Sequence, residues 1–296
     1  MNIPALRVGS QHDLYAYTPA VGREKLTWPG GARVAVWVVP NIEHYELSAP
    51  DGSIDVPQFS RTDYGNRVGI WRLMRVLDRF GIRGTVALNS AVCRHYPAVV
   101  EACLQRDWEL MGHGITNSQS LADLGPEAQR ELIGSALDEI RRAGGKPVRG
   151  WLGPGLHESP ATLDLLEAAG LVYTCDWVHD DLPVRFQNGL LSIPYTTDAN
   201  DIRMLRPPLF GALDWLALVK RAFDVLYAEG EQHPKVMCIA LHPFIIGTPG
   251  RIGLLEDILQ HIANHADVWL TTGGEIVDAY NGQSSASRSR ENLVTS

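Results

Sequence analysis

The chain has 296 residues, of which 45% are hydrophobic and 20% are charged, and its formal net charge at pH 7 is −8. This composition favours one large α/β domain, and the scattered Lys and Arg residues argue against nucleic-acid and anionic-membrane partners. No apolar stretch approaches the ~18 residues of a membrane span, the N-terminus has no signal-peptide pattern, and the four cysteines form no CxxC pair. We therefore expect a cytoplasmic protein in a reducing compartment.

In chain order, residues 1–31 are rich in Pro, Gly and Tyr, and we expect them to form an extended lead-in. The β-branched run at 32–40 predicts a strand that is buried on both faces. A Pro-, Asp- and Ser-rich loop at roughly 48–64 has the length of a functional lid. Further strands are predicted at 84–89, 108–113, 148–152, 172–177, 190–195, 236–241 and 268–272. Helices are predicted between them at 68–80, 97–104, 125–142, 159–170, 212–229 and 251–265, with a short one before Tyr280.

Strand and helix thus alternate about eight times, without the signal of an antiparallel hairpin. The pattern favours a (β/α) barrel of about seven to eight parallel strands, with a doubly wound open sheet as the second choice. Neither a GxGxxG turn nor a P-loop motif supports the open sheet. We expect the barrel to occupy residues 32–280 and a flexible Ser- and Arg-rich tail to occupy 281–296.

Polar and titratable residues recur where the predicted strands end. In a (β/α) barrel these carboxyl ends form the active site. His113 stands there between two glycines, and a backbone without Cβ atoms lets a ligand approach the imidazole ring. The other predicted strand ends carry Asn41, Glu43, Asn89, Asn117, Trp151, Gly153, Gly155, Asp176 to Asp181 and His242.

Each of these residues also has a purely structural interpretation. Glu43 is compatible with a solvated strand-end acid, and His242 is compatible with a core histidine that has its hydrogen bonds satisfied. Asp180 and Asp181 are compatible with turn caps, and Arg67 either holds a carboxylate in place or starts a helix in solvent. We assign the remaining candidates to surface or loop positions: His157, His179, His233, His261 and His265.

Five segments, in this order, resemble the polysaccharide deacetylase superfamily. They are Tyr-Gly-Asn-Arg-Val-Gly at 64–69, Gly-Ile-Arg-Gly-Thr at 81–85, Gly-His-Gly at 112–114, Arg-Gly-Trp-Leu-Gly-Pro at 149–154 and Leu-His-Pro at 241–243. Within the superfamily, the sequence is most similar to the small-molecule amide hydrolases, namely the cofactor-independent allantoinases and the cyclic imide hydrolases. The resemblance covers roughly residues 30–280 and implies a deformed (β/α) barrel that hydrolyses a carbon–nitrogen amide bond.

The sequence departs from the metal-dependent members at the ligand positions. Those members end the first strand with two aspartates, one a base and one a ligand, where this sequence has Asn41 and Glu43. They also carry two histidines four residues apart, where this sequence has His113 and Asn117. Zinc prefers Cys, His and carboxylate ligands, so Asn117 is a weak one. We expect either no cofactor or one divalent ion, preferably zinc, held by Glu43, His113 and Asn117.

The residues and the resemblance together predict an amidohydrolase that opens a small cyclic amide, imide or ureide. Glu43 is the expected base, or a ligand if metal is present, and His242 is the expected acid or oxyanion partner. His113 completes the catalytic set by orienting the water and the carbonyl group. The expected substrate-binding residues are Asn41, Arg67, Asn117, Trp151, Gly153, Gly155, Asp180 and Asp181.

Two other functions stay open at this point. One is an N-acetyl carbohydrate deacetylase, which needs a strong metal triad. The other is a catalytically inactive barrel that serves binding or assembly. For all of them we expect a homo-oligomer with no membrane partner, and for the favoured function we expect a small cyclic molecule as the substrate.

Overall fold

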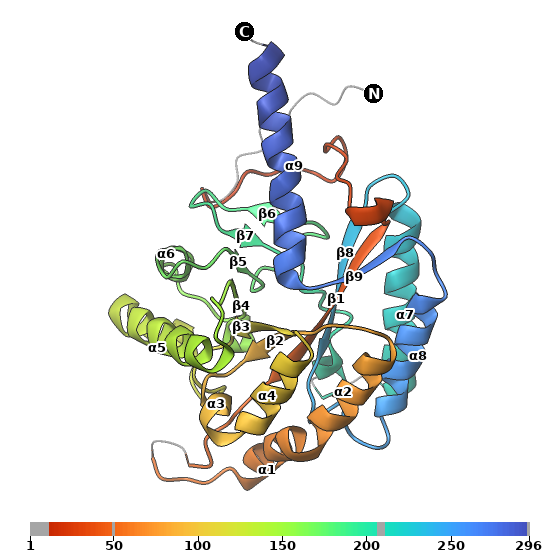
Figure 1. Ribbon diagram of the computed structural model, residues 1–296. Helices are drawn as coiled ribbons and strands as arrows, with labels where there is room; N and C mark the ends of the chain where they lie inside the picture. Colours follow the sequence, from red (N-terminus) through yellow and green to blue (C-terminus); the bar gives the residue numbers. More distant parts are fainter. Residues whose placement is uncertain (1–11, 49–50, 206–210, 295–296) are drawn as a thin grey trace.

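The computed structural model describes residues 12–48, 51–205 and 211–294. Within these residues, a nine-stranded sheet has the order β6-β7-β5-β4-β3-β2-β1-β8, with β9 also paired to β1 (Figure 1). All pairings are parallel except that of β6 with β7. The strands are β1 (Val34–Ile42), β2 (Thr85–Leu88), β3 (Glu109–Gly112), β4 (Gly150–Trp151), β5 (Tyr173–Thr174), β6 (Val184–Arg185), β7 (Leu191–Ser192), β8 (Lys235–Leu241) and β9 (Val268–Thr271).

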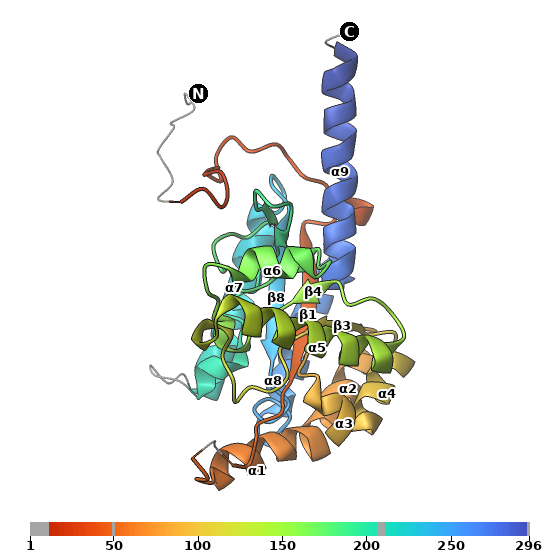
Figure 2. The same cartoon turned by 90° about the vertical axis from the view of Figure 1, so that its left-hand side faces the viewer.

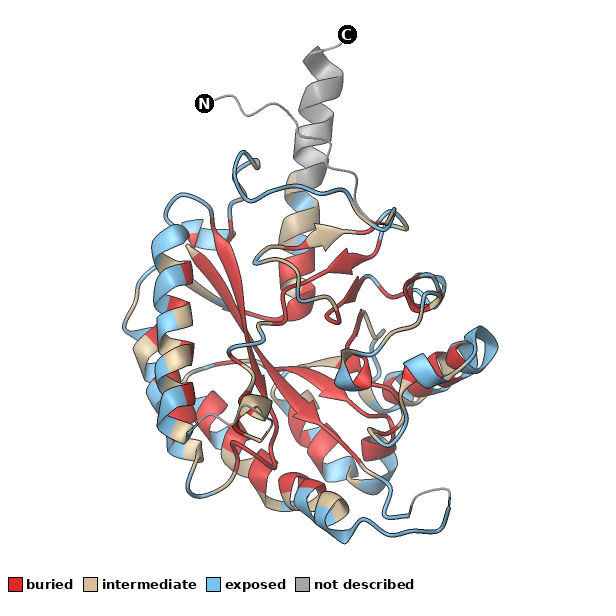
Figure 3. Cartoon of the chain, turned by 180° about the vertical axis from the view of Figure 1, so that it is seen from behind, coloured by how far each residue is buried: buried red, intermediate tan, exposed pale blue. Residues whose placement is uncertain are grey.

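Strand β1 pairs with three other strands, β2, β8 and β9, and is buried along its whole length. Its first seven residues pair with β8, the first four also pair with β9, and Asn41 and Ile42 pair with β2. Apolar β-branched residues suit a strand that has neighbours on both edges and helices or side chains on both faces. The predicted deformed barrel of parallel strands is confirmed, and Figure 3 shows buried strands flanked by helices whose outer faces are exposed.

The helices enclose this sheet. Helices α7 and α8 pack together beside β8, and α5 and α6 lie on the opposite side of β1 (Figures 1 and 2). The α-helices are α1 (Val56–Tyr64), α2 (Ile70–Arg79), α3 (Ala91–His95), α4 (Pro97–Gln105), α5 (Pro126–Gly144), α6 (Thr162–Ala168), α7 (Ala212–Glu229), α8 (Ile252–Ala263) and α9 (Gly273–Val294). A π-helical turn, η2 (Gly65–Gly69), joins α1 to α2, and a 3₁₀ turn, η5 (Asp201–Met204), precedes α7. None of the helices in the described ranges combines the length and the apolar character that crossing a bilayer requires.

The predicted loop at 48–64 is wrong in its second half, which forms α1. The side chain of Asp55 caps this helix by accepting a hydrogen bond from the backbone N–H of Gln58, and Pro57 stands in the first turn. Because Thr62 is its one buried residue, α1 has no apolar stripe that would reveal it in the sequence. None of the described residues of this segment lines the candidate active-site cavity, which argues against a lid. Residues 49–50 lie outside the described ranges.

Three further details differ from the sequence predictions. The antiparallel pair β6–β7 was not predicted, because two paired residues on each strand are too few to show periodicity. Asn41 lies inside β1 rather than beyond its end, because β1 continues to Ile42. Helix α9 continues to Val294, where the composition predicted a flexible tail, and it extends away from the sheet (Figures 1 and 2). Residues 1–11 of the predicted lead-in and residues 295–296 of the tail lie outside the described ranges.

Candidate active site

Glu43, His113 and His242 follow the carboxyl ends of β1, β3 and β8, and the fold brings their side chains together. Oε1 of Glu43 lies 3.4 Å from Nε2 of His242 and 3.6 Å from Nε2 of His113. All three residues are buried, with 2–6% of their surface exposed. Three residues whose pairwise separations in the sequence are 70, 129 and 199 positions therefore form one cluster, as we expected from the strand ends.

The ring of His113 is held in one orientation by the backbone. Its Nδ1 lies 2.6 Å from the carbonyl oxygen of Leu152, just after β4. A carbonyl oxygen can only accept, so Nδ1 carries the proton, and in the neutral ring Nε2 keeps its lone pair. Nε2 is buried without a hydrogen-bond partner among the described residues, and so is Oε2 of Glu43. Two buried acceptors thus face the same space.

His242 is held by Asp201, a residue of η5 that is fully buried. Nδ1 of His242 lies 2.7 Å from Oδ1 of Asp201, and the backbone N–H of His242 donates to Oδ2 at 2.9 Å. Burial alone would lower the pKa of His242, but the negative charges of Asp201 and Glu43 outweigh it and raise the pKa to about 10. His242 is therefore a cation at neutral pH.

Glu43 is correspondingly an anion. Burial alone would raise its pKa, but the positive charge of His242 and the close contacts of both histidines outweigh burial and lower the pKa to about 2. The backbone carbonyl of Glu43 accepts a hydrogen bond from Asn66 Nδ2 at 2.8 Å, which fixes the main chain at this point. The resting cluster is thus an ion pair of Glu43 with His242, and Nε2 of His113 lies 3.6 Å from the same carboxylate oxygen.

The cluster opens into a cavity of about 510 Å³ at the carboxyl edge of the sheet. Seven of the predicted site residues line it: Asn41, Glu43, His113, Asn117, Gly153, Gly155 and His242. The loop at 153–157 forms one wall, and its Gly155 adopts a left-handed conformation with φ of +68°. Tyr195, Asn200 and Arg203 add polar groups from the irregular connection after β7.

Comparisons with known proteins agree with this architecture. The sequence profile of the polysaccharide deacetylase family matches residues 61–174. A protein of Schizosaccharomyces pombe named "Putative polysaccharide deacetylase" is 29% identical over 242 residues, which are 75% of each chain. The crystal structure of Puue allantoinase superimposes with a TM-score of 0.84 at 29% identity, covering 93% of this chain and 98% of the other. The chain is therefore similar to the polysaccharide deacetylase superfamily in both sequence and fold.

Within this superfamily, the chain resembles the allantoinase-like branch and also several deacetylases. A peptidoglycan deacetylase of Helicobacter pylori is 21% identical over 267 residues, covering 77% of this chain and 89% of that protein. The named relatives and the named structural neighbour are thus deacetylases and an allantoinase.

The zinc ion of metal-dependent superfamily members does not fit the predicted ligands. Oδ1 of Asn117 already accepts a hydrogen bond from Asn89 Nδ2 at 3.0 Å, so the third predicted ligand is occupied. Glu43, His113 and His242 also do not form a ready metal site, because their ligand atoms do not all lie within 4.8 Å of one another. Among the described residues, only one trio of His, Cys, Asp or Glu meets that condition, and it lies elsewhere in the molecule. The ligand atoms of Glu43, His113 and His242 are therefore not gathered closely enough around one point to hold an ion as they stand.

Two of the predicted substrate-binding residues lie outside the cavity because their side chains have other partners. The side chain of Arg67 is 71% exposed, and its Nε donates to Asp63 at 2.6 Å. Arg67 therefore does hold a carboxylate, but not one at the site. Trp151 is fully buried in the core, where the missing Cβ of Gly112 makes room for its ring. Trp151 therefore does not line the cavity.

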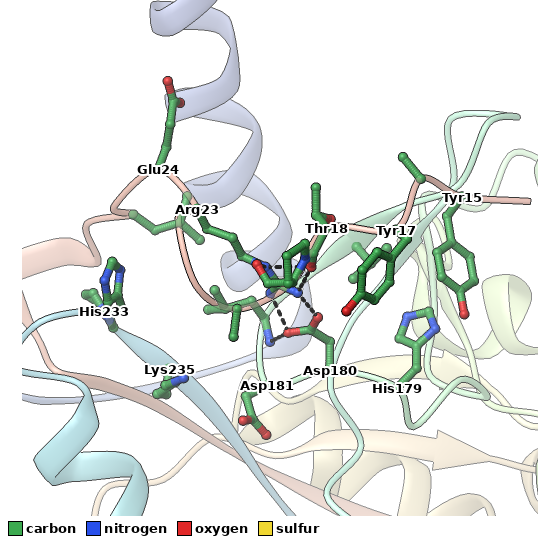
Figure 4. A pocket seen from close by; sticks show the side chains of 17 residues that line it. Tyr15, Tyr17, Thr18, Arg23, Glu24, His179, Asp180, Asp181, His233 and Lys235 are labelled. Atoms are coloured by element: carbon green, nitrogen blue, oxygen red, sulfur yellow. Dashed lines mark hydrogen bonds and ion pairs between the residues drawn. The ribbon is translucent and has the colours of Figure 1, made fainter. Parts of the chain in front are cut away.

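Asp180 and Asp181 are also wrongly placed by the prediction. Strand β5 ends at Thr174, and the chain then continues past the strand end, so that the backbone carbonyl of Asp181 accepts from Val236 near the amino end of β8. Both aspartates line a different pocket of about 500 Å³, beneath the N-terminal residues 15–26 (Figure 4). Asp180 forms hydrogen bonds there with both terminal nitrogens of Arg23.

Sequence reasoning missed Asp201 and His157 as parts of the site, and it placed Asn89 at a strand end without giving it a role. Asp201 lies in a stretch without hydrophobic periodicity. The one feature that could have pointed to it is that a charged residue stands in an unusually long connection. Asn89 directly follows β2 and links the neighbouring strand ends. Its Oδ1 accepts from the backbone N–H of His44, and its Nδ2 donates to the backbone carbonyl of His113 and to Oδ1 of Asn117. His157, assigned to the surface, is exposed and also lines the cavity.

Proposed function

We propose that this protein hydrolyses a small cyclic amide, imide or ureide and opens its ring at a carbon–nitrogen bond. One observation carries the proposal: the Glu43 carboxylate lies between the Nε2 atoms of two histidines whose Nδ1 atoms are both engaged by fixed acceptors. Such an arrangement supplies a base and an acid on either side of one reacting centre. A cavity of about 510 Å³ has the size of a small-molecule site.

The attacking water fits between Glu43 and His113. Oε2 of Glu43 and Nε2 of His113 are buried acceptors without protein partners among the described residues, so a water molecule that donates to both has a lone pair free for a carbonyl carbon. Asn117 Nδ2 makes only a 3.4 Å contact with the Tyr45 hydroxyl and keeps donor capacity for the carbonyl oxygen. Water attack then forms the new carbon–oxygen bond, and the proton of the water passes to Glu43.

His242 supplies the proton for the leaving nitrogen. As the carbon–nitrogen bond breaks, Nε2 of His242 gives its proton to the ring nitrogen, and the product is an open chain with a new carboxyl group. A carboxylate with a pKa of about 2 is a weak base while His242 is cationic. The loss of the imidazolium charge during this step makes Glu43 more basic when it must hold the proton of the water. The 3.4 Å contact then returns that proton to His242 and resets the pair.

The preference for a cyclic substrate rests on the leaving group and on the structural comparison. An imide or ureide nitrogen leaves more easily than a simple amide nitrogen, so this reaction depends less on a metal ion. The likeness to Puue allantoinase over nearly the full length of both chains supports the same choice. The names of the yeast and Helicobacter relatives support a second candidate, the removal of an acetyl group from an N-acetyl carbohydrate.

One assay separates these functions. The purified chain is incubated in parallel with succinimide, phthalimide, allantoin and a chitin oligomer, and ring loss and acetate release are measured. We expect ring opening of at least one of the three cyclic substrates, abolished in the Glu43→Gln variant. Acetate release from the chitin oligomer alone would establish the deacetylase instead, and no turnover of any compound by the folded protein would favour an inactive barrel.

A further inference from the structure

A second cluster of metal-ligating side chains lies on the outside of the molecule, between α7 and α8. It consists of Asp224 on α7, His261 in the last turn of α8 and His265 just beyond that helix. One ligand atom from each residue lies within 4.8 Å of the others, and no other trio of His, Cys, Asp or Glu in the described ranges satisfies this condition. The cluster shares no residue with the candidate cavity, so it is independent of the proposed function.

The imidazole ring of His265 is already oriented for metal binding. Nδ1 of His265 lies 2.9 Å from the backbone carbonyl of His261, so Nδ1 donates and Nε2 keeps the lone pair. Metal-binding histidines characteristically donate their other ring N–H to a carbonyl or carboxylate in this way. Phe223 contacts both rings edge-on, with centroids 5.8 Å from His261 and 5.0 Å from His265, and Tyr227 contacts His265 at 4.9 Å.

The third side chain supplies the negative charge. Oδ1 of Asp224 lies 2.6 Å from Nε2 of His261, and the two side chains are 50% and 28% exposed. Ligand bonds to zinc are about 2.0–2.2 Å long, so ligands around one ion lie roughly 3.3–3.6 Å apart. The ion therefore replaces the proton that His261 Nε2 shares with Asp224, releases it to solvent and moves the two side chains slightly apart. Two imidazoles and one carboxylate suit zinc or a similar transition ion, whereas calcium and magnesium require mainly oxygen ligands.

We propose that Asp224, His261 and His265 bind one divalent transition-metal ion, zinc in preference, which fastens α7 to α8. Partial exposure leaves the fourth position to water. In the chain, α7 follows the segment that carries Asp201, and α8 follows His242. The ion thus joins the two helices that come directly after the paired residues Asp201 and His242. Because it binds the folded state, zinc raises the thermal midpoint of unfolding with its concentration.

The test uses the full chain without an affinity tag, stripped with a chelator and titrated calorimetrically with zinc chloride. We expect one equivalent of zinc to be lost, or to bind at least ~10-fold more weakly, in the double variant His261→Ala/His265→Ala, and weaker binding in Asp224→Asn. The matched controls are Asp257→Asn, which changes an exposed carboxylate on α8, and His233→Ala. Both should keep wild-type zinc binding. Circular dichroism without metal verifies that every variant is folded.

Two further measurements distinguish zinc bound by this trio from zinc bound elsewhere on the chain. The Glu43→Gln variant separates an ion at the candidate active site from one between α7 and α8, and we expect it to keep the equivalent that the double histidine variant loses. Cobalt(II), added in place of zinc, should give the visible absorption of a nitrogen- and oxygen-ligated ion in the wild type and not in the double variant. Equal zinc stoichiometry and affinity in wild type and double variant, or no binding by the wild type at millimolar zinc, would overturn the proposal.

Discussion

The carboxylate of Asp201 accepts two hydrogen bonds from His242, one from the backbone N–H at 2.9 Å and one from Nδ1 at 2.7 Å. This double contact fixes both the main chain after β8 and the tautomer of the imidazole. Because Asp201 is completely buried, its charge is poorly screened and acts strongly on the ring. Asp201 is therefore a positioning residue that also sets the pH range in which His242 carries the proton used in the proposed mechanism.

The pH dependence of turnover should report this pair. The pKa of His242 is raised to about 10, so the imidazolium that the proposed mechanism requires exists below that pH and is lost as the pH rises through it. Asp201→Asn removes the negative charge, so the alkaline limb of kcat/KM should move to lower pH. Asp198→Asn, an exposed carboxylate three residues earlier, is the control and should leave the limb in place. An unchanged limb in Asp201→Asn would exclude His242 as the titrating acid.

Glu43→Gln should lower kcat by roughly 10²–10⁴-fold, the usual contribution of a general base. The amide keeps the shape of the side chain but cannot accept a proton from water. Glu46→Gln serves as the control, because Glu46 is a 55% exposed carboxylate three residues further along the same segment. Steady-state kinetics on the best cyclic substrate measures both variants, and near-normal turnover by a folded Glu43→Gln protein would contradict the role of Glu43 as the base.

The fold and three of the site residues could be predicted because they depend on local patterns. Buried parallel strands require continuous apolar runs, and parallel connections place the ends of β1, β3 and β8 at one edge. Glu43, His113 and His242 follow these ends directly. Asp201 could not be predicted, because its contact with His242 depends on how an aperiodic connection packs against β8. Asp181 was misplaced because residues beyond the end of β5 need not remain at the edge where that strand ends.

Gly69→Ala should destabilise the protein and disturb the site. A Cβ at Gly69 would lie 2.0 Å from the carbonyl oxygen of Pro243, the residue after His242, and a backbone atom cannot move aside easily. We expect a loss of at least about 1–3 kcal/mol in the free energy of unfolding, together with reduced turnover. Gly134→Ala is the matched control in α5, where nothing lies within 4 Å of the new Cβ, and it should stabilise the helix by about 0.5–1 kcal/mol. Chemical denaturation measures both, and equal stability of the two variants would refute the predicted clash.

Chelation should separate stability from turnover. Zinc removed from the trio Asp224, His261 and His265 lowers the thermal midpoint, but the proposed ring opening uses only protein groups and water, so kcat should stay unchanged. Elemental analysis before and after treatment verifies that the ion has left. If turnover disappears on chelation and returns with zinc even in His261→Ala/His265→Ala, then the ion acts at Glu43 and His113. In that case Asn117 must exchange its hydrogen bond with Asn89 for a metal ligand bond, and the metal-free mechanism is wrong.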